Sequence, residues 1–189
     1  MEKILFINAC VRPESRTSEL ADVVLQKVNG EIEQVDLYEA KLQIVGLREL
    51  EKRDKALNTM AFEDEVFNFA KQFANADRIV IAAPYWDLMF PSVLKVYLEN
   101  VTVSGITFGY TADGKAQGKC KAKALYYVTT SGGFIGENDF GFAYVNALAK
   151  NFFGINEIHR FSAEGLDISG ADVEKIVENA KNMILEELK

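Results

Sequence analysis

Short, unbroken runs of apolar residues recur along the chain, and such runs are typical of strands buried on both faces of a parallel sheet. Residues 4–7 and 79–83 are apolar throughout. Residues 31–37 alternate only partly between apolar and polar positions, which favours a strand nearer the sheet edge. The pattern predicts five strands, over residues 4–7, 31–37, 78–83, 123–129 and 157–161.

Apolar residues between these strands recur at spacings of three and four, the periodicity of an amphipathic helix. In the last such segment, Val173, Ile176 and Val177 begin a stripe of this kind. The spacing predicts helices over residues 20–28, 62–73, 91–101, 140–153 and 171–188. Strands and helices therefore alternate along the chain.

This alternation favours an α/β fold with a parallel sheet. Because crossovers between parallel strands are right-handed, we expect an open, doubly wound sheet with strand order 2-1-3-4-5 and helices on both faces. No repeat, low-complexity stretch or linker divides the sequence, so we expect a single domain over residues 1–189. Residues 38–60 indicate only a long connection. Residues 104–118, which contain several glycines, indicate a loop that can form one wall of a pocket.

The loop after the first strand, residues 9–17, combines hydroxyl and guanidinium groups. Ser15 and Thr17 supply caps and hydroxyl donors, and Arg12 and Arg16 supply positive charge. Unpaired backbone N–H groups and the positive end of the next helix dipole converge there, so the loop favours an anion. The plainer interpretation is a capped turn with two solvated arginines, and these residues alone favour neither.

Two further strands end in loops that suit a flat ligand. Tyr85 and Trp86 follow the third strand. Large aromatic side chains in such a loop form either a wall against which a ring binds or a hydrophobic plug, and we favour the wall. Gly132 and Gly133 follow the fourth strand, where they let the backbone approach a ligand and direct N–H groups at it. The same glycines also suit a plain turn.

In the expected strand order the first, third and fourth strands are neighbours, so these three loops meet where ligands bind in such sheets. An anion cradle, an aromatic wall and a strip of N–H donors match a phosphorylated flat heterocycle. FMN is the natural candidate, since the dinucleotide motif GxGxxG is absent from the sequence.

Composition narrows the choice of partners. The net charge of −7 argues against nucleic acid, and the 49% of hydrophobic residues include no run long enough for membrane insertion. Cys10 and Cys120 form no CxxC pair, and with His159 as the single histidine we expect no metal site. The first strand begins almost at the amino terminus without a signal segment, so we expect a cytoplasmic protein.

The chain resembles, over nearly its whole length, the flavodoxin-like NAD(P)H:quinone oxidoreductase and FMN-dependent NADH-azoreductase family. The matching stretches are residues 10–21, 83–88, 94–97 with 104–111, and 130–133. The resemblance implies a flavodoxin-like fold and hydride transfer from NADH or NADPH through FMN to a quinone, azo or nitro compound. It also implies a homodimer, and no catalytic side chain, because the flavin supplies the chemistry.

The resemblance further implies which residues bind FMN: the first loop the phosphate, the second the ring, and the third the pyrimidine edge of the ring. In that order they are Cys10, Arg12, Ser15, Arg16 and Thr17; Pro84, Tyr85, Trp86, Asp87 and Leu88; and Thr130, Ser131, Gly132 and Gly133. Two residues depart from the family pattern. Cys10 stands where serine is common, and Asp87 stands where asparagine is common.

Two other functions fit parts of the sequence. A flavodoxin-type electron carrier uses the same fold and FMN, but residues 104–118 favour a substrate pocket. The spacing of Cys10, Arg16 and Thr17 also fits the CX5R[ST] loop of low-molecular-weight phosphatases, with Cys10 as nucleophile and Arg16 as phosphate clamp. Pro13 removes one N–H from that loop and Glu14 adds a repulsive charge, so we rank the phosphatase lower.

Overall fold

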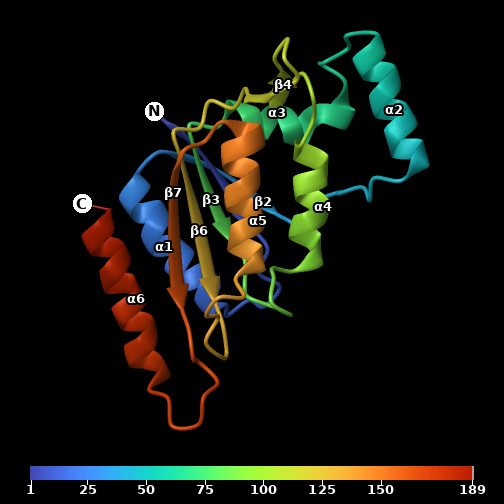
Figure 1. The fold of residues 1–189 in the computed structure, drawn as a ribbon. Coiled ribbons are helices and arrows are strands. Elements are labelled where there is room, and N and C mark those ends of the chain that lie inside the picture. Colours follow the sequence, from blue (N-terminus) through green and yellow to red (C-terminus); the bar gives the residue numbers. More distant parts are fainter. Residues whose placement is uncertain (189) are drawn as a thin grey trace.

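The computed structural model describes residues 1–188, so Lys189, the last residue of the expected domain, lies outside the described part. Five parallel strands form one sheet in the order β2-β1-β3-β6-β7 (Figure 1). Their bounds are β1 Lys3–Asn8, β2 Glu31–Asp36, β3 Arg78–Ala82, β6 Ala124–Thr130 and β7 Glu157–Ala163. The predicted doubly wound sheet and its strand order are confirmed.

Helices cover both faces of this sheet (Figure 1). The bounds of all α-helices are α1 Arg16–Val28, α2 Leu47–Asn58, α3 Asn68–Asn75, α4 Ser92–Val101, α5 Phe140–Leu148 and α6 Val173–Glu187, and all but α2 cover the sheet. Side chains of successive strand residues point to opposite faces. Leu5 and Ile7 therefore pack on one face with residues of α3, α4 and α5, and Ile4 and Phe6 pack on the other with residues of α1 and α6.

Helix α2 lies where only a connection was expected, so the interpretation of residues 38–60 is incomplete. The helix projects beyond α3 and α4 (Figure 1) and buries only Arg53 and Ala56. The Arg53 guanidinium donates hydrogen bonds to the Glu99 carbonyl oxygen at 3.1 Å and to Asn100 Oδ1 at 3.4 Å. Because this attachment is polar, the sequence of α2 lacks the apolar stripe by which helices are found.

Residues 104–118 form a hairpin rather than the expected loop. Strands β4, Phe108–Tyr110, and β5, Ala116–Gly118, pair antiparallel. The buried Thr107 holds the hairpin to the end of α4, since its Oγ1 donates to the Val101 carbonyl at 2.8 Å and accepts from the Val103 N–H at 3.0 Å. Three-residue strands are too short to show alternation, which is why the pattern missed them.

Two predicted helices differ in helix type from those observed. The helix expected over residues 62–73 begins as a 3-10 turn, Glu65–Phe67, capped by Asp64, and becomes α-helical only in α3. The helix expected over residues 140–153 is α5 followed by a π-helical turn, Ala149–Phe153, which ends at Gly154 in the left-handed region. No helix within residues 1–188 has the length and apolar composition of a membrane span.

His159 on β7 lies between two carboxylates, one on the sheet and one on the last helix. Its Nδ1 is 2.6 Å from Glu187 Oε1, and its Nε2 is 3.1 Å from Glu157 Oε1. Burial lowers the pKa of His159, but the hydrogen bonds to Glu187 and Glu157 outweigh burial, so the pKa is raised above its ordinary value. The protonated imidazole therefore stabilises the fold.

This raised pKa predicts how stability depends on pH. The stabilisation is complete below the unfolded-state pKa of about 6.5 and is lost as the pH rises through the higher folded-state pKa. We expect the free energy of unfolding, measured in urea, to fall across this window, and we expect His159→Gln to remove that fall. An equal fall in the variant would contradict the assignment.

Candidate functional site

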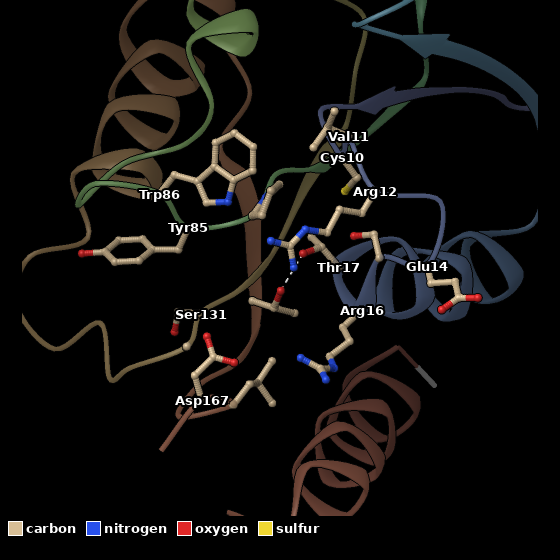
Figure 2. A pocket seen from close by; sticks show the side chains of 15 residues that line it. Cys10, Val11, Arg12, Glu14, Arg16, Thr17, Tyr85, Trp86, Ser131 and Asp167 are labelled. Atoms are coloured by element: carbon tan, nitrogen blue, oxygen red, sulfur yellow. Dashed lines mark hydrogen bonds between the residues drawn. The ribbon is translucent and has the colours of Figure 1, made fainter. Parts of the chain in front are cut away.

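The loops that follow β1, β3 and β6 meet at the carboxyl ends of these strands around a cavity of about 490 Å³ (Figure 2). All of the predicted site residues line it except Asp87, Leu88 and Gly133. Four residues that the site prediction did not include also line it. They are Val11, Glu14, Leu166 and Asp167.

The first loop turns into α1 and presents the amino end of this helix to the cavity, the end at which we expect an anion to bind. Ser15 caps the helix, and its Oγ accepts a hydrogen bond from the Ser18 N–H at 3.4 Å. The N–H groups at the start of a helix have no partner within the helix, so those of Arg16 and Thr17 are available to an anion. Figure 2 shows the Arg12 and Arg16 side chains reaching from this loop into the cavity.

A pair of hydroxyl groups joins the first loop to the sheet. Thr17 Oγ1 lies 2.6 Å from Thr130 Oγ1, which ties the first turn of α1 to the end of β6 (Figure 2). Thr17 is buried, whereas Arg12 and Arg16 are exposed to the cavity. The pair therefore fixes the distance between the anion-binding end and the loop after β6.

Cys10 lies at the bottom of the first loop, and its thiol is directed into the protein. The side chain is 7% exposed, and Sγ is 3.8 Å from the Ala82 carbonyl oxygen. Burial raises the pKa of this thiol. A nucleophilic cysteine needs a lowered pKa, so Cys10 does not have the environment that a phosphatase requires.

The second loop turns tightly between Trp86 and Met89. These two residues exchange backbone hydrogen bonds of 2.7 and 2.8 Å, and Asp87 and Leu88 between them have φ angles of 51° and 66°. Positive φ at both central residues is the signature of a type I′ turn, in which aspartate or asparagine is tolerated and leucine is disfavoured. Both residues are exposed at the tip of the turn, away from the cavity.

The two aromatic residues of this loop play different parts. Trp86 is 41% exposed and turns its indole ring toward the cavity, with the N–H edge facing Arg12 (Figure 2). Tyr85 extends away from Arg12, and its hydroxyl donates to the Asn138 carbonyl at 2.9 Å. Trp86 is therefore the main aromatic wall, while the Tyr85 ring connects the second loop to the third.

The third loop is held by the last residue of β7 and by the chain that follows it. Ser131 donates its N–H to the Ala163 carbonyl, and the Gly132 carbonyl accepts from the Asp167 N–H at 2.9 Å. A Cβ atom on Gly132 would lie 2.2 Å from Asp167 Oδ2, so a larger residue there would displace this carboxylate. Close approach of a ligand was expected at Gly132, and in the structure the group that closely approaches it is the Asp167 side chain.

An ionic cluster under the third loop holds it to β7. Arg160 Nε donates to Asp139 Oδ2 at 2.6 Å and Arg160 Nη2 donates to Glu164 Oε1 at 3.0 Å, while Glu164 Oε2 accepts from the Ile135 N–H. Burial raises the pKa of Glu164, but the Ile135 N–H and Arg160 outweigh burial, so the pKa is lowered. These contacts fix the loop that borders the cavity.

Leu166 and Asp167 line the cavity from a loop that the sequence analysis did not assign to the site. They follow β7, the fifth strand of the predicted order, which lies directly beside β6. The predicted order therefore contained the signal, because the loop after an adjacent strand ends at the same edge of the sheet.

Comparison with known proteins places the chain in a family. The family model described as "Flavodoxin-like fold" matches residues 2–188. The chain is 36% identical to FMN-dependent NADH:quinone oxidoreductase 2 of Clostridium acetobutylicum, with 100% of this chain and 99% of that protein covered. It is 35% identical to FMN-dependent NADH:quinone oxidoreductase of Clostridium beijerinckii, with 95% and 94% covered.

Solved structures show the same fold. An azoreductase from Bacillus anthracis str. Sterne superimposes with a TM-score of 0.86 at 24% identity, covering 100% of this chain and 99% of the other. A FMN-dependent NADH-azoreductase from Bacillus anthracis str. Ames Ancestor, in complex with FMN, superimposes with a TM-score of 0.82 at 22% identity, covering 100% and 98%.

Proposed function

Since the chain belongs to the flavodoxin-like family that includes the FMN-dependent NADH:quinone oxidoreductases, we propose that it is an FMN-dependent oxidoreductase acting on NADH and a small electron acceptor. The observation that supports this most directly is one cavity that joins the amino end of α1 to the indole of Trp86. A phosphate suits the amino end of α1, and a flat ring suits the indole of Trp86. A quinone or an azo compound is the proposed acceptor.

Residues of all three loops would hold FMN in this cavity. The N–H groups of Arg16 and Thr17 and the guanidinium groups of Arg12 and Arg16 would bind the phosphate. Trp86 and Pro84 would pack against the ring, and the third loop would border its polar edge. Bound FMN supplies hydride acceptance from NADH and reduction of the acceptor, while the protein supplies binding and orientation.

The proposed reduction of the acceptor does not require a side chain of this site as proton donor. The thiol of Cys10 is buried and has a raised pKa, and Tyr85 directs its hydroxyl to Asn138. Water entering the open cavity can supply the proton to a quinone. The proposed work of the chain is therefore to fix the ring and to set its electrostatic environment.

The purified protein tests this proposal directly. We expect a yellow protein that releases one FMN per chain on heating and that oxidises NADH with a quinone, without a partner reductase. Finding no chromophore, or FAD, would refute the cofactor assignment. Bound FMN without NADH oxidation would indicate the flavodoxin-type electron carrier instead.

We also propose that the protein is a homodimer. Large apolar side chains are exposed on the loops beside the cavity and at the start of α5, where a second copy could cover them. The exposed fractions are 41% for Trp86, 49% for Leu88, 78% for Phe134 and 53% for Phe140. Analytical ultracentrifugation at micromolar concentration tests this, and an active monomer would contradict it.

The cytoplasm is the proposed location. Cys10 and Cys120 are both free thiols, which suits a reducing compartment, and NADH is the cosubstrate named for the relatives. Fractionation of cells that produce the protein from its natural gene tests this location.

Cys10→Ser separates the proposed function from the phosphatase alternative. Serine is of similar size and can donate the same hydrogen bond, so we expect a yellow variant with near-normal quinone reduction. Neither form should hydrolyse an aryl phosphate. Phosphate hydrolysis by the unsubstituted protein that vanishes in Cys10→Ser would overturn the proposal, because only a thiolate nucleophile explains that loss.

A further inference from the structure

Two carboxylates line the cavity, and they lie at different ends of it. Glu14 immediately precedes Ser15, the cap of α1, so it belongs to the anion-binding end. Asp167 follows β7 and is hydrogen-bonded through its backbone to Gly132 of the third loop. Figure 2 shows Asp167 beside Ser131 and Glu14 on the far side of Arg16. The cavity therefore places one negative charge near each end.

Backbone contacts fix the position of Asp167. The Leu166 N–H donates to the Ser131 carbonyl at 3.1 Å, and the Asp167 N–H donates to the Gly132 carbonyl at 2.9 Å. The carboxylate covers the Cα of Gly132, where a Cβ atom would be 2.2 Å away. The charge is thus held at the loop that connects to the aromatic wall, because the Tyr85 N–H donates to the Thr130 carbonyl at 2.9 Å.

No ion pair among residues 1–188 neutralises the negative charge of Asp167, unlike the charges of the other carboxylates near this loop. Arg160 pairs with Asp139 and Glu164, whereas no ion pair among residues 1–188 includes Asp167. Asp167 is exposed to the cavity. Its charge therefore acts on whatever group lies against the third loop in the cavity.

We propose that Asp167 tunes the bound flavin, making the negatively charged reduced form of FMN less stable in this cavity than the neutral-ring oxidised form. The inference rests on the proposed function, because it requires FMN in this cavity. A fixed negative charge repels the charge that the ring gains on reduction, which lowers the reduction potential and makes the reduced cofactor a stronger reductant. Glu14 lies at the first loop, so in the proposal its charge acts mainly on the phosphate, whose charge does not change on reduction.

The experiment compares Asp167→Asn with Glu14→Gln, two substitutions that each remove one charge and keep the shape of the side chain. The dissociation constants of oxidised and reduced FMN are measured by anaerobic titration of the FMN-free protein, and the reduction potential is measured against a reference dye. For Asp167→Asn we expect reduced FMN to gain about tenfold in affinity relative to oxidised FMN, a rise in potential of about 30 mV for a two-electron couple. For Glu14→Gln we expect both affinities to change by the same factor.

Each other outcome has a definite meaning. Equal changes for both forms of FMN in Asp167→Asn would place the charge at the phosphate and overturn the proposal, as would no change at all. If Asp167→Asn does not fold, Asp167→Ser removes the same charge with a smaller side chain and gives the same readout. Failure of the unsubstituted protein to bind FMN would refute the proposed function itself, and this result is visible before any variant is made.

Discussion

Arg16→Ala is expected to weaken FMN binding by about 10- to 150-fold, which corresponds to roughly 1.5 to 3 kcal/mol, the usual contribution of a hydrogen bond to a charged group. Arg16 is the first residue of α1 and lines the cavity, so its guanidinium and its backbone N–H lie at the same anion-binding end. The substitution removes the guanidinium and leaves the N–H. Some affinity should therefore remain, and the loss should shrink at high salt.

Fluorescence titration of the FMN-free protein measures this loss, and two further variants sharpen it. Arg48→Ala removes an exposed guanidinium from α2, outside the cavity lining, and should leave FMN affinity unchanged. Arg12→Ala tests the second guanidinium of the loop. A larger loss in Arg12→Ala with none in Arg16→Ala would show that Arg12, and not Arg16, meets the phosphate.

The sheet could be predicted because its strands are buried on both faces. Residues 4–7 and 79–83 are continuous apolar runs, and in the structure residues 4–7 lie in β1 and residues 79–82 lie in its neighbour β3. Right-handed crossovers then leave few possible strand orders. The meeting of the three loops follows from that order, so the position of the site was also predictable.

Elements attached by polar or backbone contacts could not be predicted in this way. Helix α2 is anchored through Arg53, and the β4–β5 hairpin is anchored through the buried Thr107. Neither contact leaves a periodic apolar signal in the sequence. The pattern of hydrophobic residues reports burial of apolar faces, and these elements bury little of that kind.

Details of the site depended on contacts between distant loops. Asp87 and Leu88 were expected against the ring, but the two-residue turn from Trp86 to Met89 places them at its tip. The side chain that closely approaches Gly132 is that of Asp167, a residue more than thirty positions away. Sequence reasoning can indicate that a glycine matters, but the atom that approaches it is set by the tertiary fold.

Gly118 illustrates the same limit and leads to the prediction with the largest effect on stability. It lies on β5 against the end of the π-helical turn, where a Cβ atom would be 2.2 Å from both the Phe153 carbonyl carbon and the Gly154 nitrogen. Both are backbone atoms and cannot rotate away. Gly118→Ala must therefore separate the hairpin from the helix end, and overpacking of this kind costs about 3 kcal/mol.

Gly109→Ala in the facing strand is the matched control. A Cβ atom there would be 3.0 Å from Lys119 Cε, the flexible part of an exposed side chain that can move aside. We expect Gly118→Ala to lower the melting temperature by roughly 6 to 12 °C, and Gly109→Ala to change it little. Urea unfolding of both variants gives the free energies. Equal stabilities would show that the hairpin and the helix end are not in backbone contact in solution, and the hairpin would then be free to move relative to the sheet.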